Sequence, residues 1–156
     1  MVADVRFINP EGLSRPLTYT QVVEVVVPGR TIYVAGQLGT DRDGKLVGGD
    51  FRAQAEQVFK NLQLALASVG ASCADIVKLN SYLADIAHLP ILREVRARYL
   101  DAAALPASTT LAVTGFAREG ALLEVEAVAV LARSAGRARP SGAKRAAVKS
   151  ARRTKR

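Results

Sequence analysis

The residues that could take part in chemistry gather in two segments of the C-terminal half of the chain. In LPASTTLAV, residues 105–113, a run of three hydroxyls from Ser108 to Thr110 follows a proline. In LLEVEAVAV, residues 122–130, Glu124 stands within an apolar segment. A hydroxyl can act as a nucleophile, line a ligand site or simply favour a strand. A carboxylate among apolar residues is costly unless it is hydrogen-bonded or lines a wet cleft, so Glu124 is a candidate for either role.

Nucleophilic catalysis by Ser108 would require an adjacent base. The chain has a single histidine, His88, which lies in a different segment and shows no triad pattern. We therefore expect Ser108 to be a donor that lines a pocket. No HExxH, paired-cysteine, Walker A or GxSxG pattern occurs in the sequence, so metal and phosphate-loop chemistry are unsupported.

The length and the charge distribution indicate one near-neutral domain followed by a basic C-terminal tail. A chain of 156 residues that is 49% hydrophobic can form one core. Nine of the 22 Lys and Arg residues lie in 134–156, which holds no acid, so 1–133 carries 13 basic against 14 acidic residues. We predict a folded domain over 1–133 and a disordered basic tail over 134–156. The tail could contact nucleic-acid phosphates non-specifically, or it could be a solvated segment that aids solubility or contacts acidic proteins.

Cysteine content and hydropathy bear on the compartment. Cys73 is the only cysteine, and the sequence shows neither a signal-peptide pattern nor an apolar run long enough to span a membrane. These features predict a soluble, cytoplasmic protein without an intrachain disulfide.

The hydrophobic patterns predict an α+β fold with the order β-β-β-α-β-α-β-β. Asp50 and Gly70 are the expected caps of the first helix. On the second helix we expect the arginines, Arg96 among them, to point mostly outward. We expect the third strand to be the hairpin partner of the second. The predicted strands are 3–8, 19–27, 31–37, 76–83, 109–114 and 122–131, and the predicted helices are 51–69 and 89–103.

The two predicted helices have one apolar stripe each, so they most simply cover one face of a single sheet. The last strand, 122–131, is largely apolar on both of its sides. A second apolar face with no helix left to cover it predicts burial by another subunit. We therefore predict a homo-oligomer in which sheets pack together at the centre.

Taken together, these segments resemble the Rid family of reactive intermediate deaminases, also called the YjgF or L-PSP family. The resemblance implies a chorismate-mutase-like subunit with a mixed β-sheet and two helices on one face. It also implies a homotrimer with a central β-barrel and small-ligand clefts between subunits. The best-known members hydrolyse imines and enamines, such as 2-iminopropanoate and 2-iminobutanoate, without a metal or organic cofactor. The match covers residue 1 to about 132 and includes YTQ at 19–21, YVAGQ at 33–37, the segment 54–86, LPAS at 105–108 and LLEVEAVAV at 122–130.

The resemblance also implies site residues, with departures. Tyr19 matches a family tyrosine that borders the cleft, and Glu124 matches a glutamate placed to orient a water or pass a proton. Ser108 stands where the deaminating members have an arginine that grips the substrate carboxylate through two parallel charged donors. This change argues against the family's known 2-imino acid substrates. Three further positions depart from the family pattern: Ala35 replaces a serine, Thr110 a cysteine and Arg96 an asparagine on the second helix.

We therefore expect Glu124 to be catalytic, and we expect substrate to be bound by Tyr19, Ala35, Arg96, Ser108 and Thr110. Arg96 could supply the missing positive charge from a new direction, or it could be an ordinary solvated arginine. Glu124 could instead be structural. The leading hypothesis is a trimer that binds and hydrolyses a small carbonyl-, imine- or enamine-type metabolite. The alternatives are a non-catalytic ligand-binding or chaperone-like trimer, and a protein associated with nucleic acid through its tail.

Overall fold

The computed structural model describes residues 4–26 and 29–131. The predicted order of strands and helices is confirmed. The basic tail lies outside the described residues, so its disorder and its contact with nucleic acid stay predictions. In the described residues, no helix has the length and apolar character that crossing a membrane requires. The elements are β1 (Val5–Ile8), β2 (Val22–Val25), β3 (Arg30–Leu38), α1 (Phe51–Ala67), β4 (Ile76–Leu83), α2 (Leu89–Ala97), β5 (Ala107–Ala112) and β6 (Leu123–Leu131), with single 3-10 turns at Cys73–Asp75 and Ile86–His88.

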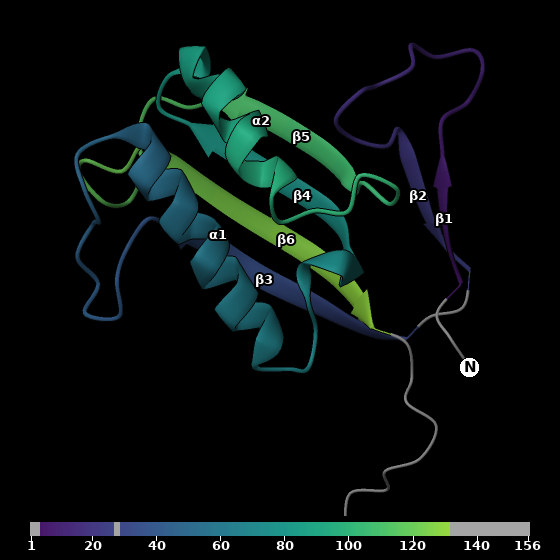
Figure 1. The fold of residues 1–156 in the computed structure, drawn as a ribbon, viewed down its shortest axis with the longest axis horizontal. Coiled ribbons are helices and arrows are strands. Elements are labelled where there is room, and N and C mark those ends of the chain that lie inside the picture. Colours follow the sequence, from purple (N-terminus) through teal and green to yellow (C-terminus); the bar gives the residue numbers. More distant parts are fainter. Residues whose placement is uncertain (1–3, 27–28, 132–156) are drawn as a thin grey trace, which may run out of the picture.

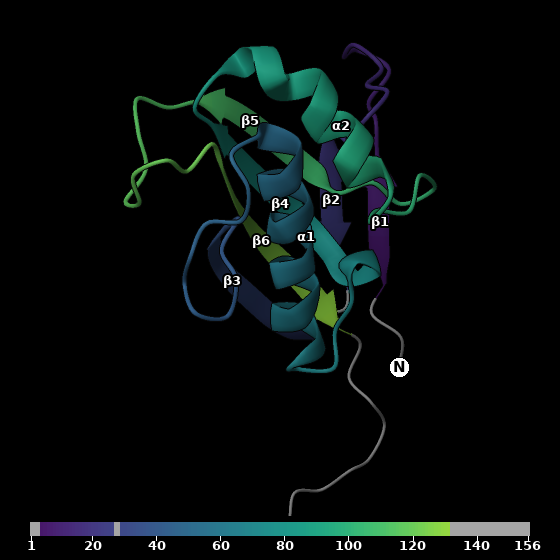
Figure 2. The same cartoon turned by 60° about the vertical axis from the view of Figure 1, so that its left-hand side comes forward.

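The main sheet has four strands in the order β3-β6-β4-β5. Its β4–β5 pair is parallel, and its other pairs are antiparallel. Figures 1 and 2 show α1 and α2 together on one face of this sheet, as the sequence predicted. The mixed sheet with two helices on one side is therefore confirmed for the single chain.

The expected hairpin between the second and third strands is wrong. Strand β2 pairs with β1 in a separate two-stranded sheet, whereas β3 pairs with β6. Local pattern identifies a strand but not its partner, which is decided by the shared core. Here Val34 of β3 lies opposite Ala127 of β6, and both side chains are buried on the helix side.

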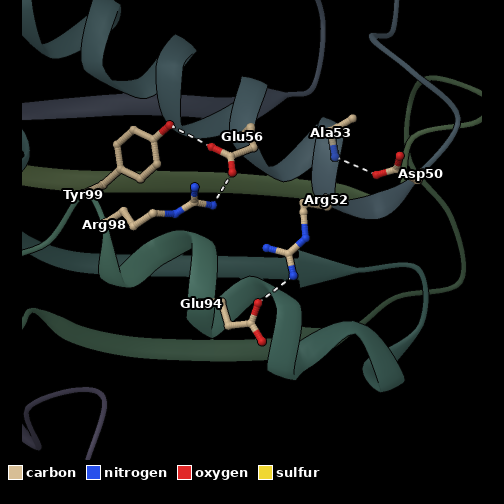
Figure 3. A network of polar contacts seen from close by, with 7 residues as sticks. All are labelled: Asp50, Arg52, Ala53, Glu56, Glu94, Arg98 and Tyr99. Atoms are coloured by element: carbon tan, nitrogen blue, oxygen red, sulfur yellow. Dashed lines mark hydrogen bonds and ion pairs between the residues drawn. The ribbon is translucent and has the colours of Figure 1, made fainter.

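Helix α1 has the caps that the sequence indicated. The Asp50 carboxylate accepts a hydrogen bond of 2.8 Å from the amide of Ala53, which Figure 3 shows at the start of the helix. Gly70 has a φ of 76°, in the left-handed region that favours glycine. Near this turn the Ala71 amide donates to the Leu66 carbonyl at 2.9 Å, so the last turn of the helix is closed.

Polar contacts join the two helices on their outer side (Figure 3). The Arg52 guanidinium donates to Glu94 at 2.6 Å, and Arg98 pairs with Glu56. The Tyr99 hydroxyl donates to the same Glu56 carboxylate at 3.2 Å. Exposed ion pairs contribute little each. These contacts mark the side of α2 that lies next to α1, whereas the buried residues of α2 mark the side that faces the sheet.

Helix α2 departs from two expectations. It ends at Ala97, shorter than the predicted 89–103. Arg96 is buried, with 5% of its surface exposed, whereas it was expected to point outward. The physical reason is spacing: Arg96 follows Leu92 and Val95 on the buried stripe, and all three face the sheet side of the helix. The neighbouring arginines of the helix are exposed, as expected.

The two faces of the main sheet are covered unequally. Along β6, Leu123, Val125, Ala127 and Ala129 are buried beneath the helices. Glu124, Glu126 and Val128 alternate with them and are only half-buried. Tyr33 of β3, which lies opposite Val128, is 80% exposed. We call this second side the open face, and among residues 4–26 and 29–131 of a single chain no layer covers it.

Candidate functional site

A hollow of about 270 Å³ lies on the helix side of the sheet, at the edge formed by β5. Ser108 and Thr110 point into this side because they pair with Leu79 and Ser81 of β4, which are both fully buried in the core. The structure thus brings together four of the six predicted site residues: Tyr19, Arg96, Ser108 and Thr110. Thr18, Leu89 and Arg93 complete the lining. We refer to this hollow as the hydroxyl hollow.

The segment that carries Tyr19 is tied to the start of β5. The Thr20 hydroxyl donates to the carbonyl of Leu105 at 2.6 Å, and the Thr20 amide donates to the carbonyl of Pro106 at 3.1 Å. These bonds hold a segment distant in sequence beside β5. They give Tyr19 a defined place at the rim of the hydroxyl hollow, although β1 and β2 form a sheet of their own.

The Arg96 guanidinium lies at the wall of the hydroxyl hollow. Its Nη1 donates to the Ser108 hydroxyl at 3.2 Å, and its Nη2 donates to the carbonyl of Thr18 at 3.0 Å. Within residues 4–26 and 29–131, no carboxylate lies within ion-pair distance of it. Burial, and after it the positive charge of Arg93, hold the pKa of Arg96 below the ordinary value for arginine.

The contact with Arg96 also bears on Ser108 as a nucleophile. A guanidinium has donors only, so it cannot accept the serine proton. His88, the one imidazole of the chain, stacks on Phe51 with ring centroids 4.4 Å apart and is not one of the residues that line the hollow. The arrangement around Ser108 therefore suits hydrogen bonding to a ligand and gives no base for nucleophilic attack.

Glu124 lies on the open face, not in the hydroxyl hollow. It pairs with Tyr82 of β4 and with Leu38 of β3, which sets its side chain opposite to those of Val125 and Ser108. Its carboxylate lies directly against Gly36, where an added Cβ would come within 1.8 Å of Oε1. Gly36 is therefore required for this close approach.

Ala35, the last predicted site residue, is on the open face as well. It borders an open hollow of about 390 Å³ that is lined by residues of β3, β4 and β6. Within one chain, Ala35 and Glu124 are thus separated by the sheet from Ser108 and Thr110. The predicted set forms two groups, one on each side of the sheet.

A polar cluster on the open face was not predicted as a site. The Glu126 Oε1 accepts hydrogen bonds from the Asn80 amide at 2.8 Å and from the Tyr82 hydroxyl at 2.9 Å. These bonds hold the pKa of Glu126 below its ordinary value, and the Glu126 contact raises the pKa of Tyr82. Nearby, Lys78 donates to Thr109 at 2.8 Å. The signal was present in the sequence, because Lys78, Asn80 and Tyr82 alternate along one strand and must share a face.

Across residues 4–26 and 29–131, no group of three His, Cys, Asp or Glu side chains is placed to hold a metal ion. The chemistry that the two groups offer is instead that of hydroxyls, one buried guanidinium and two carboxylates. These groups can bind an anion, orient a water molecule and transfer protons.

Comparison with known proteins gives the family. Residues 12–131 match the family model described as Endoribonuclease L-PSP. The chain is 30% identical over 128 residues to a 2-iminobutanoate/2-iminopropanoate deaminase of Dermatophagoides farinae, covering 81% of this chain and 96% of that protein. It is 36% identical over 113 residues to the mouse (Mus musculus) protein of the same name, covering 72% of this chain and 80% of that one.

Solved structures agree with this assignment. A Rid-family protein of unknown function from Yersinia pestis has a TM-score of 0.72 at 35% identity, covering 81% of this chain and 98% of that one. A RidA from an Antarctic Psychrobacter has a TM-score of 0.62 at 33% identity, covering 81% and 99%. The chain therefore belongs to the Rid family, the YjgF or L-PSP proteins that the sequence pattern indicated.

Proposed function

We propose that this protein binds a small imine- or enamine-type metabolite and hydrolyses it to the carbonyl compound and ammonia. The observation that carries the proposal is the hydroxyl hollow, where Tyr19, Ser108 and Thr110 lie together with a buried guanidinium. Relatives that share about a third of their residues with this chain are named as deaminases of 2-iminobutanoate and 2-iminopropanoate. The function assigned to them is the one that best suits these groups.

The complete site is formed between subunits of a homotrimer. Glu124 and the hydroxyl hollow lie on opposite faces of the sheet in one chain, so a ligand cannot contact both within that chain. A neighbouring copy that packs on the open face would bring its own hydroxyl hollow towards Glu124. Such packing would also cover the exposed ring of Tyr33 and the half-buried Val128.

The proposed reaction adds water to the imine carbon. Glu124 accepts one proton of the water as its oxygen bonds to carbon, and the imine nitrogen gains a proton to give a carbinolamine. The hydroxyl proton is then transferred to the amino nitrogen through Glu124 as the carbon–nitrogen bond breaks, so that the carbonyl compound forms and ammonia leaves. An enamine is first protonated on carbon, which converts it into the imine. The balance is one imine and one water consumed for one carbonyl compound and one ammonia.

The experiment is a turnover assay with 2-iminobutanoate that a dehydratase releases in situ. Glu124→Gln removes the proton acceptor but keeps the size and polarity of the side chain, so the rate of ammonia release should fall about 100-fold or more. Light scattering should show an unchanged assembly. Glu119→Gln, a substitution of an exposed loop carboxylate, is the matched control and should retain activity.

Two outcomes would count against the proposal. Equal turnover by the wild type and Glu124→Gln would show that Glu124 has no role in catalysis. A wild-type protein that binds the keto-acid product without accelerating hydrolysis would favour the non-catalytic ligand-binding trimer instead. This second candidate is favoured by Ser108, which stands where the resemblance implies an arginine.

A further inference from the structure

We infer that Arg96 of helix α2 is the carboxylate anchor of this site, so that its ligand is a small organic acid held by a guanidinium from the helix. The inference deepens the proposed function, since it concerns the same hollow and names the class of ligand. It also explains how a site that lacks the family's strand arginine can still select an acid.

The first argument is the absence of a partner for a buried charge. The Arg96 side chain is 5% exposed, and in the described part of the chain its charge is not matched by any carboxylate within 4.0 Å. The charge that acts on its pKa is that of another cation, Arg93. A buried charge is costly unless an opposite charge accompanies it. An anionic ligand would supply that opposite charge.

The second argument is geometry. Each amino nitrogen of Arg96 makes one hydrogen bond, to Ser108 and to the Thr18 carbonyl, and a guanidinium has five N–H donors in total. These two bonds fix the plane of the guanidinium and leave donors available. The Ser108 hydroxyl accepts from Arg96, so its own proton is available to an acceptor. One charged fork and one hydroxyl side by side suit the two oxygens of a carboxylate.

The third argument is the contrast between the two hollows that Arg96 borders. The second hollow, of about 130 Å³, is lined mainly by apolar residues: Leu17, Ala97, Leu100, Ala102 and Leu105, with Thr18 and Arg93. Apart from the arginines and the Thr18 hydroxyl, those side chains offer an anion no hydrogen bond. The carboxylate therefore belongs in the hydroxyl hollow, where Tyr19, Ser108 and Thr110 can add donors.

The contact between positions 96 and 108 also relates two departures from the family pattern. The resemblance places an asparagine at position 96 and an arginine at position 108, whereas this chain has arginine and serine. In the structure the two side chains touch. If the resemblance holds at these two positions, the contact places one guanidinium at the site from the helix instead of from the strand.

The test is a binding measurement with 2-oxobutanoate, the keto-acid product, and with 2-butanone, its neutral analogue, using calorimetry on the full chain. Wild-type protein should bind the acid and discriminate against the ketone.

Arg96→Gln should weaken binding of the acid about 10- to 100-fold, the effect of losing a charged hydrogen-bonded pair. Arg96→Lys, which keeps the charge without the fork, should give a smaller loss. The matched control is Arg98→Gln, which removes the same charge from an exposed position of the same region and should bind normally.

The contact between positions 96 and 108 gives a second variant. Arg96→Asn combined with Ser108→Arg restores the family arrangement and should recover binding that Arg96→Asn alone has lost. Ser108→Arg alone should fail to strengthen binding, because two guanidinium groups would then crowd one contact. If the Arg96 variants fold poorly, the Nε–Hε resonance of Arg96 in wild-type protein provides the measurement, and it should shift as 2-oxobutanoate is added.

Four results would overturn the inference: no binding of 2-oxobutanoate by the wild type, equal affinity in Arg96→Gln, an equal loss in Arg98→Gln, or a saturable titration that leaves the Arg96 resonance unmoved. These results are distinct from failure of the proposed function. Binding that depends on Arg96 without any hydrolysis would support Arg96 as the carboxylate anchor and contradict the proposed hydrolytic function. Hydrolysis at an equal rate in wild type and Arg96→Gln would support the proposed function and contradict Arg96 as the carboxylate anchor.

Discussion

The two faces of the main sheet differ in what covers them and in the charge they carry. On the helix side, α1 and α2 bury a continuous apolar layer, and a cationic hollow opens at the β5 edge, around Arg96. On the open face, Glu124 and Glu126 lie among exposed or half-buried side chains. One chain thus presents a positive, hydroxyl-lined group on one side and an acidic group on the other.

The difference between the faces shows why a single chain is an incomplete site. Because successive side chains of a strand point to opposite faces, the register of β4, β5 and β6 places Ser108 and Glu124 on opposite sides of the sheet. An enzyme that needs both an anchor for the substrate and an acid for the proton transfers must then combine two chains. The same packing would cover the apolar side chains of the open face, so assembly and catalysis would depend on one interface.

Mixing two inactive variants gives the largest expected effect. If each site takes Glu124 from one subunit and Arg96 from its neighbour, co-assembly of Glu124→Gln with Arg96→Gln restores both wild-type residues to about a quarter of the sites. With 2-iminobutanoate kept well below the concentration that fills the weakened Arg96→Gln site, turnover should then rise from the low rate of either variant alone to about a quarter of the wild-type rate.

The controls for this experiment are mixtures of each variant with wild-type protein. Both should retain about half of the wild-type activity wherever the two residues come from. A mixture of the two variants that stays inactive, although light scattering shows mixed oligomers, would mean that both residues act within one chain. That result would contradict the separation of the two groups by the sheet.

Gly36→Ala gives a smaller effect on the acidic group alone. An added Cβ would lie 1.8 Å from Glu124 Oε1 and 2.7 Å from its Cδ, so the carboxylate must move. Because the end of a glutamate side chain is flexible, the fold should survive while turnover falls about 10- to 100-fold. Gly115→Ala is the matched control, because its Cβ would meet nothing within 4 Å. Equal activity in the two variants would show that the position of Glu124 is unimportant.

Much of this arrangement could be predicted from the sequence, because it follows from local periodicity. The amphipathic pattern predicted α1 and its caps, and the alternation in 122–131 predicted that Glu124 and Val125 would face opposite ways. The family pattern predicted the group around Ser108. Apart from that group, which joins distant segments, these features depend on residues close together in the chain, so the local pattern of side chains is enough to predict them.

The features that were missed depend on contacts between distant segments. Pairing of β2 with β1, and of β3 with β6, is decided by which apolar faces share a core. The burial of Arg96 contradicts the expectation that a charged side chain on a helix is exposed, and its spacing from Leu92 places it on the buried stripe. To predict that Ala35 and Glu124 lie on the other face from Ser108, one would also have to know how the strands of the sheet pair.

The smallest expected effect concerns Glu126, and it measures how far the open face is covered. Hydrogen bonds from Asn80 and Tyr82 hold the pKa of Glu126 below its ordinary value of 4.5. A lowered folded-state pKa means that the stabilisation is present above the unfolded-state pKa and is lost as the pH falls through the folded-state pKa. Glu126→Gln should therefore lower the melting temperature slightly near neutral pH, and the two proteins should converge in acid.

The size of that difference depends on the surroundings of the carboxylate. On a face open to water the hydrogen-bonded carboxylate contributes almost nothing, because solvent screens it. Beneath neighbouring subunits the same bonds strengthen, since the local dielectric constant falls. Thermal melts of wild type and Glu126→Gln from neutral to acidic pH distinguish the two cases. A difference that is absent at every pH would mean that no other copy covers the open face, and a shared site between subunits would lose its basis.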